Sequence, residues 1–120
     1  MIEILPGTAN DLVGIKVSGK LTDKEYKEVL IPSLDAAIKA NGKVRLLCHM
    51  DQGFKGWEWA AAWDDLTFWL KHKNDFSKLA VIGATKWIEV STKLSAHIMA
   101  GEVKFFPEGE SQNAWEWIKG

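Results

Sequence analysis

The sequence has little cysteine and proline: it contains one cysteine and three prolines. It also lacks the roughly 18 consecutive apolar residues that a membrane-spanning helix needs. A single cysteine cannot form an internal disulfide, which favours a reducing compartment, and Cys48 lies in an apolar run where a buried, unreactive thiol is expected. Residues 1–7 lack the basic and apolar regions of a signal peptide. We therefore expect a cytoplasmic protein without a transmembrane segment.

An excess of charge of one sign is also missing. The chain has 15 Lys and Arg residues against 16 Asp and Glu residues, a net charge of −1 and a pI near 6.3. Nucleic acids and anionic membranes attract proteins through a broad positive field. We therefore expect no nucleic-acid partner.

Motifs for cofactors and catalysis are absent as well. His49, His72 and His97 lie in separate segments without the paired spacing of metal ligands, which predicts no metal site. Gly53 and Gly56 match neither a phosphate-binding loop nor a dinucleotide fingerprint. No serine lies in a Gly-x-Ser-x-Gly elbow. We predict no cofactor and no enzymatic activity.

Apolar sequence is plentiful. Hydrophobic residues make up 47% of the chain, enough for one core, and the length leaves no room for a second. We expect a single domain over residues 1–120. Two short apolar segments, residues 2–5 and 12–19, flank turn-forming residues and predict an antiparallel hairpin.

A helix is expected to follow the hairpin. Thr22 and Glu25 have the spacing of a capping box, so the helix should begin at Thr22. Its apolar stripe continues to a stop signal at residues 41–42. Pro32 interrupts the stripe and predicts a kink or break near Ile31.

The rest of the chain alternates short apolar runs with helical periodicity. Strands are expected at residues 43–50, 79–83 and 103–106, and helices at residues 57–73, 86–99 and 113–119. The order is ββαβαβαβα. Right-handed crossovers pack each helix back on the sheet, so the four later strands should be parallel and the first an antiparallel edge. The predicted fold class is a small layered α/β domain.

Ligands of open α/β sheets bind beyond the C-terminal ends of the strands. Three loops qualify here: residues 19–22, 50–56 and 83–87. The middle loop carries the most varied chemistry, with Asp51, Gln52, Gly53, Phe54 and Gly56. Asp and Gly also favour ordinary turns and helix caps, so a plain turn with Asp51 near a helix start is the competing interpretation.

Both central helices have two apolar faces. In the first, Trp59, Trp63, Leu66 and Leu70 form a stripe that faces the core. In the second, one face comprises Trp87, Val90, Ser91, Leu94 and Ile98, and the other comprises Ile88, Thr92, Ser95 and Met99. The opposite faces of the two helices carry Trp57, Ala61, Phe68, Ile88, Thr92 and Met99. These residues predict an interaction surface that packs internally, on a second subunit, or around an apolar ligand.

The element order, the passage VSGKLT at residues 17–22, and the ending at residues 102–118 together resemble the SpoIIAA-like family, which is related to STAS domains. The resemblance covers essentially the whole chain and implies a small bacterial regulatory module. The fold is also similar to CRAL-TRIO domains, in which a cleft under mobile helices holds an apolar ligand.

Anti-sigma factor antagonists of this kind carry a phosphorylatable Ser or Thr directly after an Asp, in the loop after the third strand. Here Gln52 follows Asp51, and no Ser or Thr occurs between Cys48 and Leu66. The phosphate charge that would release a partner therefore has no site. We expect a non-enzymatic interaction module that forms a homodimer or binds an unknown protein. The alternative is a binder of a lipid or other small apolar molecule.

Overall fold

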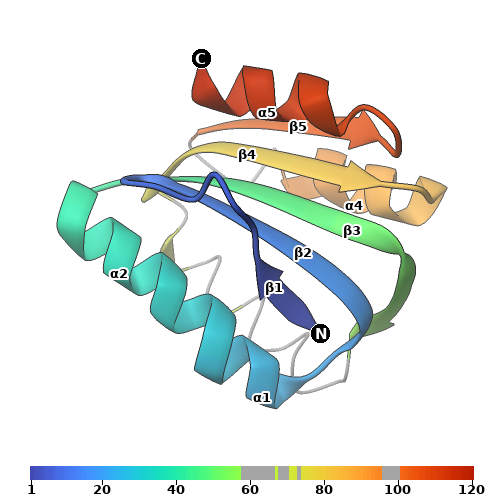
Figure 1. Ribbon diagram of the computed structural model, residues 1–120, viewed down its shortest axis with the longest axis horizontal. Coiled ribbons are helices and arrows are strands. Elements are labelled where there is room, and N and C mark those ends of the chain that lie inside the picture. Colours follow the sequence, from blue (N-terminus) through green and yellow to red (C-terminus); the bar gives the residue numbers. More distant parts are fainter. Residues whose placement is uncertain (58–66, 68–70, 73, 96–100) are drawn as a thin grey trace.

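A five-stranded sheet forms the centre of the computed structural model, which describes all residues except 58–66, 68–70, 73 and 96–100 (Figure 1). The strands are β1 (Ile2–Ile4), β2 (Leu12–Leu21), β3 (Val44–Trp57), β4 (Phe76–Gly83) and β5 (Glu102–Pro107). They lie side by side in the order of the sequence. β1 is antiparallel to β2, and the other neighbours are parallel. The predicted mostly parallel sheet with an antiparallel edge is confirmed.

Helices cover both faces of the sheet. The helices whose bounds lie in the described residues are α1 (Asp23–Glu25), the π-helical turn η1 (Tyr26–Leu30), α2 (Ile31–Asn41), α4 (Lys86–Ser95) and α5 (Ser111–Lys119). Residues of η1, α2 and α4 pack on one face, and residues of α5 pack on the other. Figure 1 shows α5 above the sheet and α2 below it.

The first helix begins at Thr22, as predicted. The Glu25 amide donates to Thr22 Oγ1 over 3.2 Å, and the Thr22 hydroxyl donates to Glu25 Oε1 over 3.1 Å. The second carboxylate oxygen of Glu25 accepts the Ile2 amide at 2.7 Å. The cap therefore also fixes β1 against the start of the helix.

Pro32 interrupts the helix at the predicted place. A proline has no amide hydrogen, and its ring clashes with the carbonyl four residues earlier. The wider η1 turn precedes it, and the amide of Ile31 donates to the carbonyl of Tyr26 five residues back. α2 then ends at the predicted stop signal, where Gly42 has a φ of 82° and donates to the Ile38 carbonyl over 2.7 Å.

Two apolar cores flank the sheet because successive strand residues point to opposite faces. Leu46 belongs to the core under α2 and α4, whereas Leu47 belongs to the core under α5. The α5 core consists of Leu12, Leu47, Ala80, Ile82, Phe106, Ala114 and Ile118. In the described part of the chain, no helix is both long and apolar enough to cross a membrane.

β3 is longer than predicted, and the loop expected at residues 50–56 is wrong. The backbone from Asp51 to Trp57 continues as strand, so Gln52, Gly53, Phe54 and Gly56 lie in β3 and Trp57 ends it. The reason is pairing with β2: Gly19 lies opposite Phe54, and Leu21 lies opposite Trp57. Register shifts on either side of Gly19 take up the additional residues of β3.

Candidate functional site

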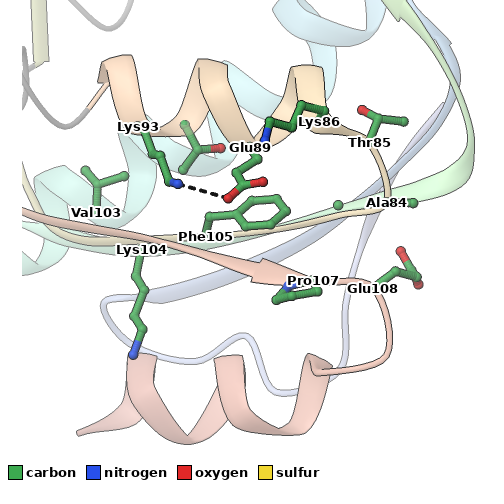
Figure 2. A pocket seen from close by; sticks show the side chains of 12 residues that line it. Ala84, Thr85, Lys86, Glu89, Lys93, Val103, Lys104, Phe105, Pro107 and Glu108 are labelled. Atoms are coloured by element: carbon green, nitrogen blue, oxygen red, sulfur yellow. Dashed lines mark hydrogen bonds and ion pairs between the residues drawn. The ribbon is translucent and has the colours of Figure 1, made fainter.

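An open groove of about 840 Å³ lies between α4 and β5 (Figure 2). It is lined by Gly83, Ala84, Thr85, Lys86, Glu89, Thr92, Lys93, Val103, Lys104, Phe105, Pro107 and Glu108. The last residue of β4, Gly83, and the residues after it, Ala84 and Thr85, belong to the lining, so the groove includes part of the third loop nominated from the sequence. Of the described strands, β5 pairs with β4 alone, which places the groove along the last strand of the sheet.

The floor of the groove is apolar because side chains along β5 point alternately to the two faces of the sheet, and those on the α4 side are apolar. Val103 and Phe105 are half-buried and pack against the core under α2 and α4. Lys104 has the opposite orientation: its Nζ lies 5.2 Å from the centre of the Phe106 ring. Figure 2 shows its side chain directed toward α5, away from α4. Phe105 instead lies beneath α4 in the same view.

The wall formed by α4 is charged. Lys86, Glu89 and Lys93 have the spacing of one helical stripe and line the groove. Lys93 Nζ donates to Glu89 Oε2 over 2.9 Å. This hydrogen bond and the positive charges of Lys93 and Lys86 lower the pKa of Glu89. Glu108 adds a second carboxylate to the lining, whereas the ammonium group of Lys104 lies on the α5 side of the sheet.

Ile88 and Thr92 do not face away from the sheet, so their predicted orientation is wrong. Each is 5% exposed, and Ile88 packs in the core under α2 and α4. Val90, which the sequence placed on the opposite face of the helix, is 45% exposed. The Thr92 hydroxyl donates to the Ile88 carbonyl over 2.8 Å, so burying it leaves no unpaired polar group.

An ion pair and a histidine–carboxylate contact lie near the C-terminal halves of the parallel strands. Lys16 Nζ is 3.8 Å from Asp51 Oδ2, and His49 Nε2 is 3.0 Å from Glu108 Oε1. The second pair joins β3 to the segment after β5. Asp51 is therefore a strand residue in an ion pair, not a turn residue.

Two further titratable side chains, those of Cys48 and His72, are not part of the groove lining. Burial raises the pKa of the Cys48 thiol to about 12, although part of the residue is exposed, and this disfavours the nucleophilic thiolate. His72 Nδ1 lies 2.8 Å from Asp75 Oδ2, and its Nε2 lies 3.6 Å from Asp35 Oδ1. Within the described residues, no group of three or more His, Cys, Asp or Glu side chains has the geometry to hold a metal.

The family model for SpoIIAA-like proteins matches residues 12–119. The chain belongs to the SpoIIAA-like family. It is also similar to the crystal structure of an uncharacterized protein from Shewanella loihica PV-4, of the DUF3478 family with a SpoIIAA-like fold. The two share 31% sequence identity with a TM-score of 0.78, over 98% of this chain and 93% of the other. No curated protein matches the chain at a significant level.

Part of the predicted interaction surface of this SpoIIAA-like chain lies outside the described residues. This applies to Ala61, Phe68 and Met99, and to the side chain of Trp57. Of the helix predicted for residues 57–73, Thr67, Lys71 and His72 are helical.

Sequence reasoning also missed groove residues of this SpoIIAA-like chain. Glu108 pairs with His49 across 59 positions of sequence, a separation that periodicity does not detect. The sequence did contain one signal for this contact, because the C-terminal ends of parallel strands lie along the same edge of a sheet. Glu108 follows a strand that ends at this edge, and His49 lies in another. Combining the expected strand ends would have brought the two residues together.

Proposed function

We propose that this SpoIIAA-like chain is a non-enzymatic interaction module that docks a protein partner at the groove between α4 and β5. The carrying observation is the composition of the groove, which joins an apolar floor from Val103 and Phe105 to a charged wall on α4. Protein interfaces have this anatomy, with apolar residues at the centre and charged residues at the rim. The reducing compartment inferred from the single cysteine supports a cytoplasmic site of action.

The proposal includes no phosphorylation switch after Asp51. Gln52 occupies the next position, and an amide side chain cannot accept a phosphoryl group as an ester. The backbone there belongs to β3 and is paired with β2 nearby. Partner exchange at the groove would accordingly depend on affinity and concentration.

A small apolar ligand is the competing occupant. The charged groups of Lys86, Glu89 and Lys93 line the groove. Charged groups lose favourable hydration next to a purely apolar molecule, whereas a protein partner supplies polar groups and water at its rim. The groove composition therefore favours a protein.

Photo-crosslinking in the native cells tests this function. A photoreactive amino acid at Lys86, on the groove, should give a covalent adduct with a protein. The same probe at the exposed Lys39 of α2 is the control and should not give that adduct. Absence of a protein adduct from position 86 would contradict the proposal. A retained apolar molecule found by native mass spectrometry would then support the alternative.

A further inference from the structure

The outer edge of β5 presents backbone groups in a defined order. The Glu108 amide donates to the Gly83 carbonyl of β4 over 3.0 Å, and the β4–β5 register has no shift. The backbone amide and carbonyl groups of successive residues in a parallel strand alternate in direction. Those that point toward β4 belong to Glu102, Lys104 and Phe106. The backbone polar groups that point outward belong to Val103, Phe105 and Pro107.

Proline at an outward position fits an edge strand, because a missing amide costs the sheet no hydrogen bond there. Val103 and Phe105 each present one amide and one carbonyl at this edge. Of the described strands, none pairs with it. An added strand is the backbone partner that such an edge accepts, and two-fold pairing of two identical strands makes it antiparallel.

The side chains of β5 complement a second copy of the same strand. Glu102 and Lys104 are both exposed and point to the same face, two residues apart. In an antiparallel pair with Val103 opposite the partner's Val103, Glu102 lies opposite the partner's Lys104. Lys104 likewise lies opposite the partner's Glu102, which gives two pairs of opposite charge.

The other registers that match outward groups are less favourable. A shift of one residue on each strand places Lys104 opposite the partner's Lys104, which repels. A further shift places Val103 opposite the partner's Pro107, which has no amide to donate. Charge and hydrogen bonding therefore select the register centred on Val103.

We infer that two copies of this chain pair through antiparallel β5 strands, with Glu102 of each opposite Lys104 of the other. The pairing makes one continuous sheet of ten strands from the two five-stranded sheets. Its two-fold axis is perpendicular to the sheet, so both α4 helices lie on the same face and their grooves face each other. The inference rests on the proposed function, since it names the partner of the same surface.

Charge reversal tests the pairing by sedimentation velocity at low ionic strength. The wild-type chain should dimerise at or below about 100 µM. Glu102→Lys and Lys104→Glu each turn two attractive pairs into two repulsive ones and should raise the dimer Kd at least about tenfold. The double variant exchanges the charges and should restore the Kd to within about threefold of wild type.

Controls separate this effect from misfolding and from a change in net charge. Glu28→Lys alters an exposed charge on η1 and should leave the dimer Kd unchanged. Glu102→Gln removes the attraction without repulsion and should weaken the dimer by about threefold. Thermal melts of all variants should match wild type, since both positions are exposed.

Three results would overturn the inference: a wild-type monomer at about 100 µM, single reversals without effect, or a double variant that fails to recover. A monomer whose position-86 probe still captures a different protein would reject the homodimer and leave the proposed function standing. A monomer with no protein adduct would reject both.

Discussion

Arg45 shows how much of this fold depends on one side chain. Its Nε and Nη2 donate to the two oxygens of Asp11 over 3.0 and 2.9 Å. Its Nη1 donates to the carbonyls of Ile118 and Lys119 over 2.7 and 3.1 Å. The guanidinium therefore joins the start of β2, the start of β3 and the end of α5, and its flat fork bonds all of them at once. A positive charge at the C-terminus of α5 also suits the helix dipole.

Asp11→Asn should destabilise the protein in a pH-dependent way. The hydrogen bond from Arg45, together with its positive charge, lowers the pKa of Asp11 against the opposing effect of burial. The folded-state pKa lies below the unfolded value, so the stabilisation is present at neutral pH and disappears as pH falls through the folded-state pKa, below about pH 4. Because the pair is partly exposed, we expect a loss of about 1 kcal/mol at pH 7.

Urea titrations at pH 7 and at about pH 3 measure this difference. As a control, Asp23→Asn removes a more exposed ion pair with Lys27 and should cost less than about 0.5 kcal/mol. An Asp11→Asn variant as stable as wild type at pH 7 would show that Arg45 needs no charged partner there.

At the scale of the elements, α5 packs closely on the sheet because Gly14 has no side chain at the point of contact. A Cβ added at Gly14 would lie 2.5 Å from Cη2 of Trp115, closer than real Cβ atoms come to a ring. Gly14 lies in β2 and Trp115 in α5, so the missing side chain lets the indole rest on the strand. Lys119 Nζ lies 5.7 Å from the same ring.

Gly14→Ala should therefore destabilise the protein by about 1–3 kcal/mol through overpacking. Thermal and urea denaturation measure the loss. In a Trp115→Leu background the ring is gone, and the same alanine should cost less than about 0.5 kcal/mol. Equal costs in both backgrounds would mean that the backbone of Gly14, and not the indole, resists the substitution.

The elements that the sequence predicted correctly are those with local causes. The helix start at Thr22 depends on contacts three residues apart, and the break near Ile31 depends on Pro32. The end of β3 was missed because residues 51–57 are strand only through pairing with β2, more than thirty positions away. The orientation of α4 was missed because aliphatic residues occur on two faces, and the internal bond of the Thr92 hydroxyl is not visible in periodicity.

For the molecule as a whole, the sheet separates two apolar cores. Ile15 is 1% exposed in the core under α2 and α4, and Ile118 is fully buried in the core under α5. The two cores should still unfold in one transition, because every strand from β2 to β4 contributes residues to both.

Ile15→Val and Ile118→Val should each cost about 0.5–1.5 kcal/mol, and the double variant should lose the sum to within about 0.5 kcal/mol. Urea denaturation followed by tryptophan fluorescence and by circular dichroism measures both the free energies and the number of transitions. A coupling larger than about 0.5 kcal/mol would mean that strain passes through the sheet from one core to the other. Separate transitions would mean that each face folds alone.

The match between strand order and sequence order has a consequence for synthesis on the ribosome. Each strand from β2 to β5 emerges after the neighbour with which it pairs, so the sheet can grow from one edge without waiting for a distant segment. α5 is the exception, because it covers a face to which β2, β3, β4 and β5 have already contributed. Until residue 118 leaves the exit tunnel, that face stays bare, and during this interval the nascent chain is most exposed to chaperones and to aggregation.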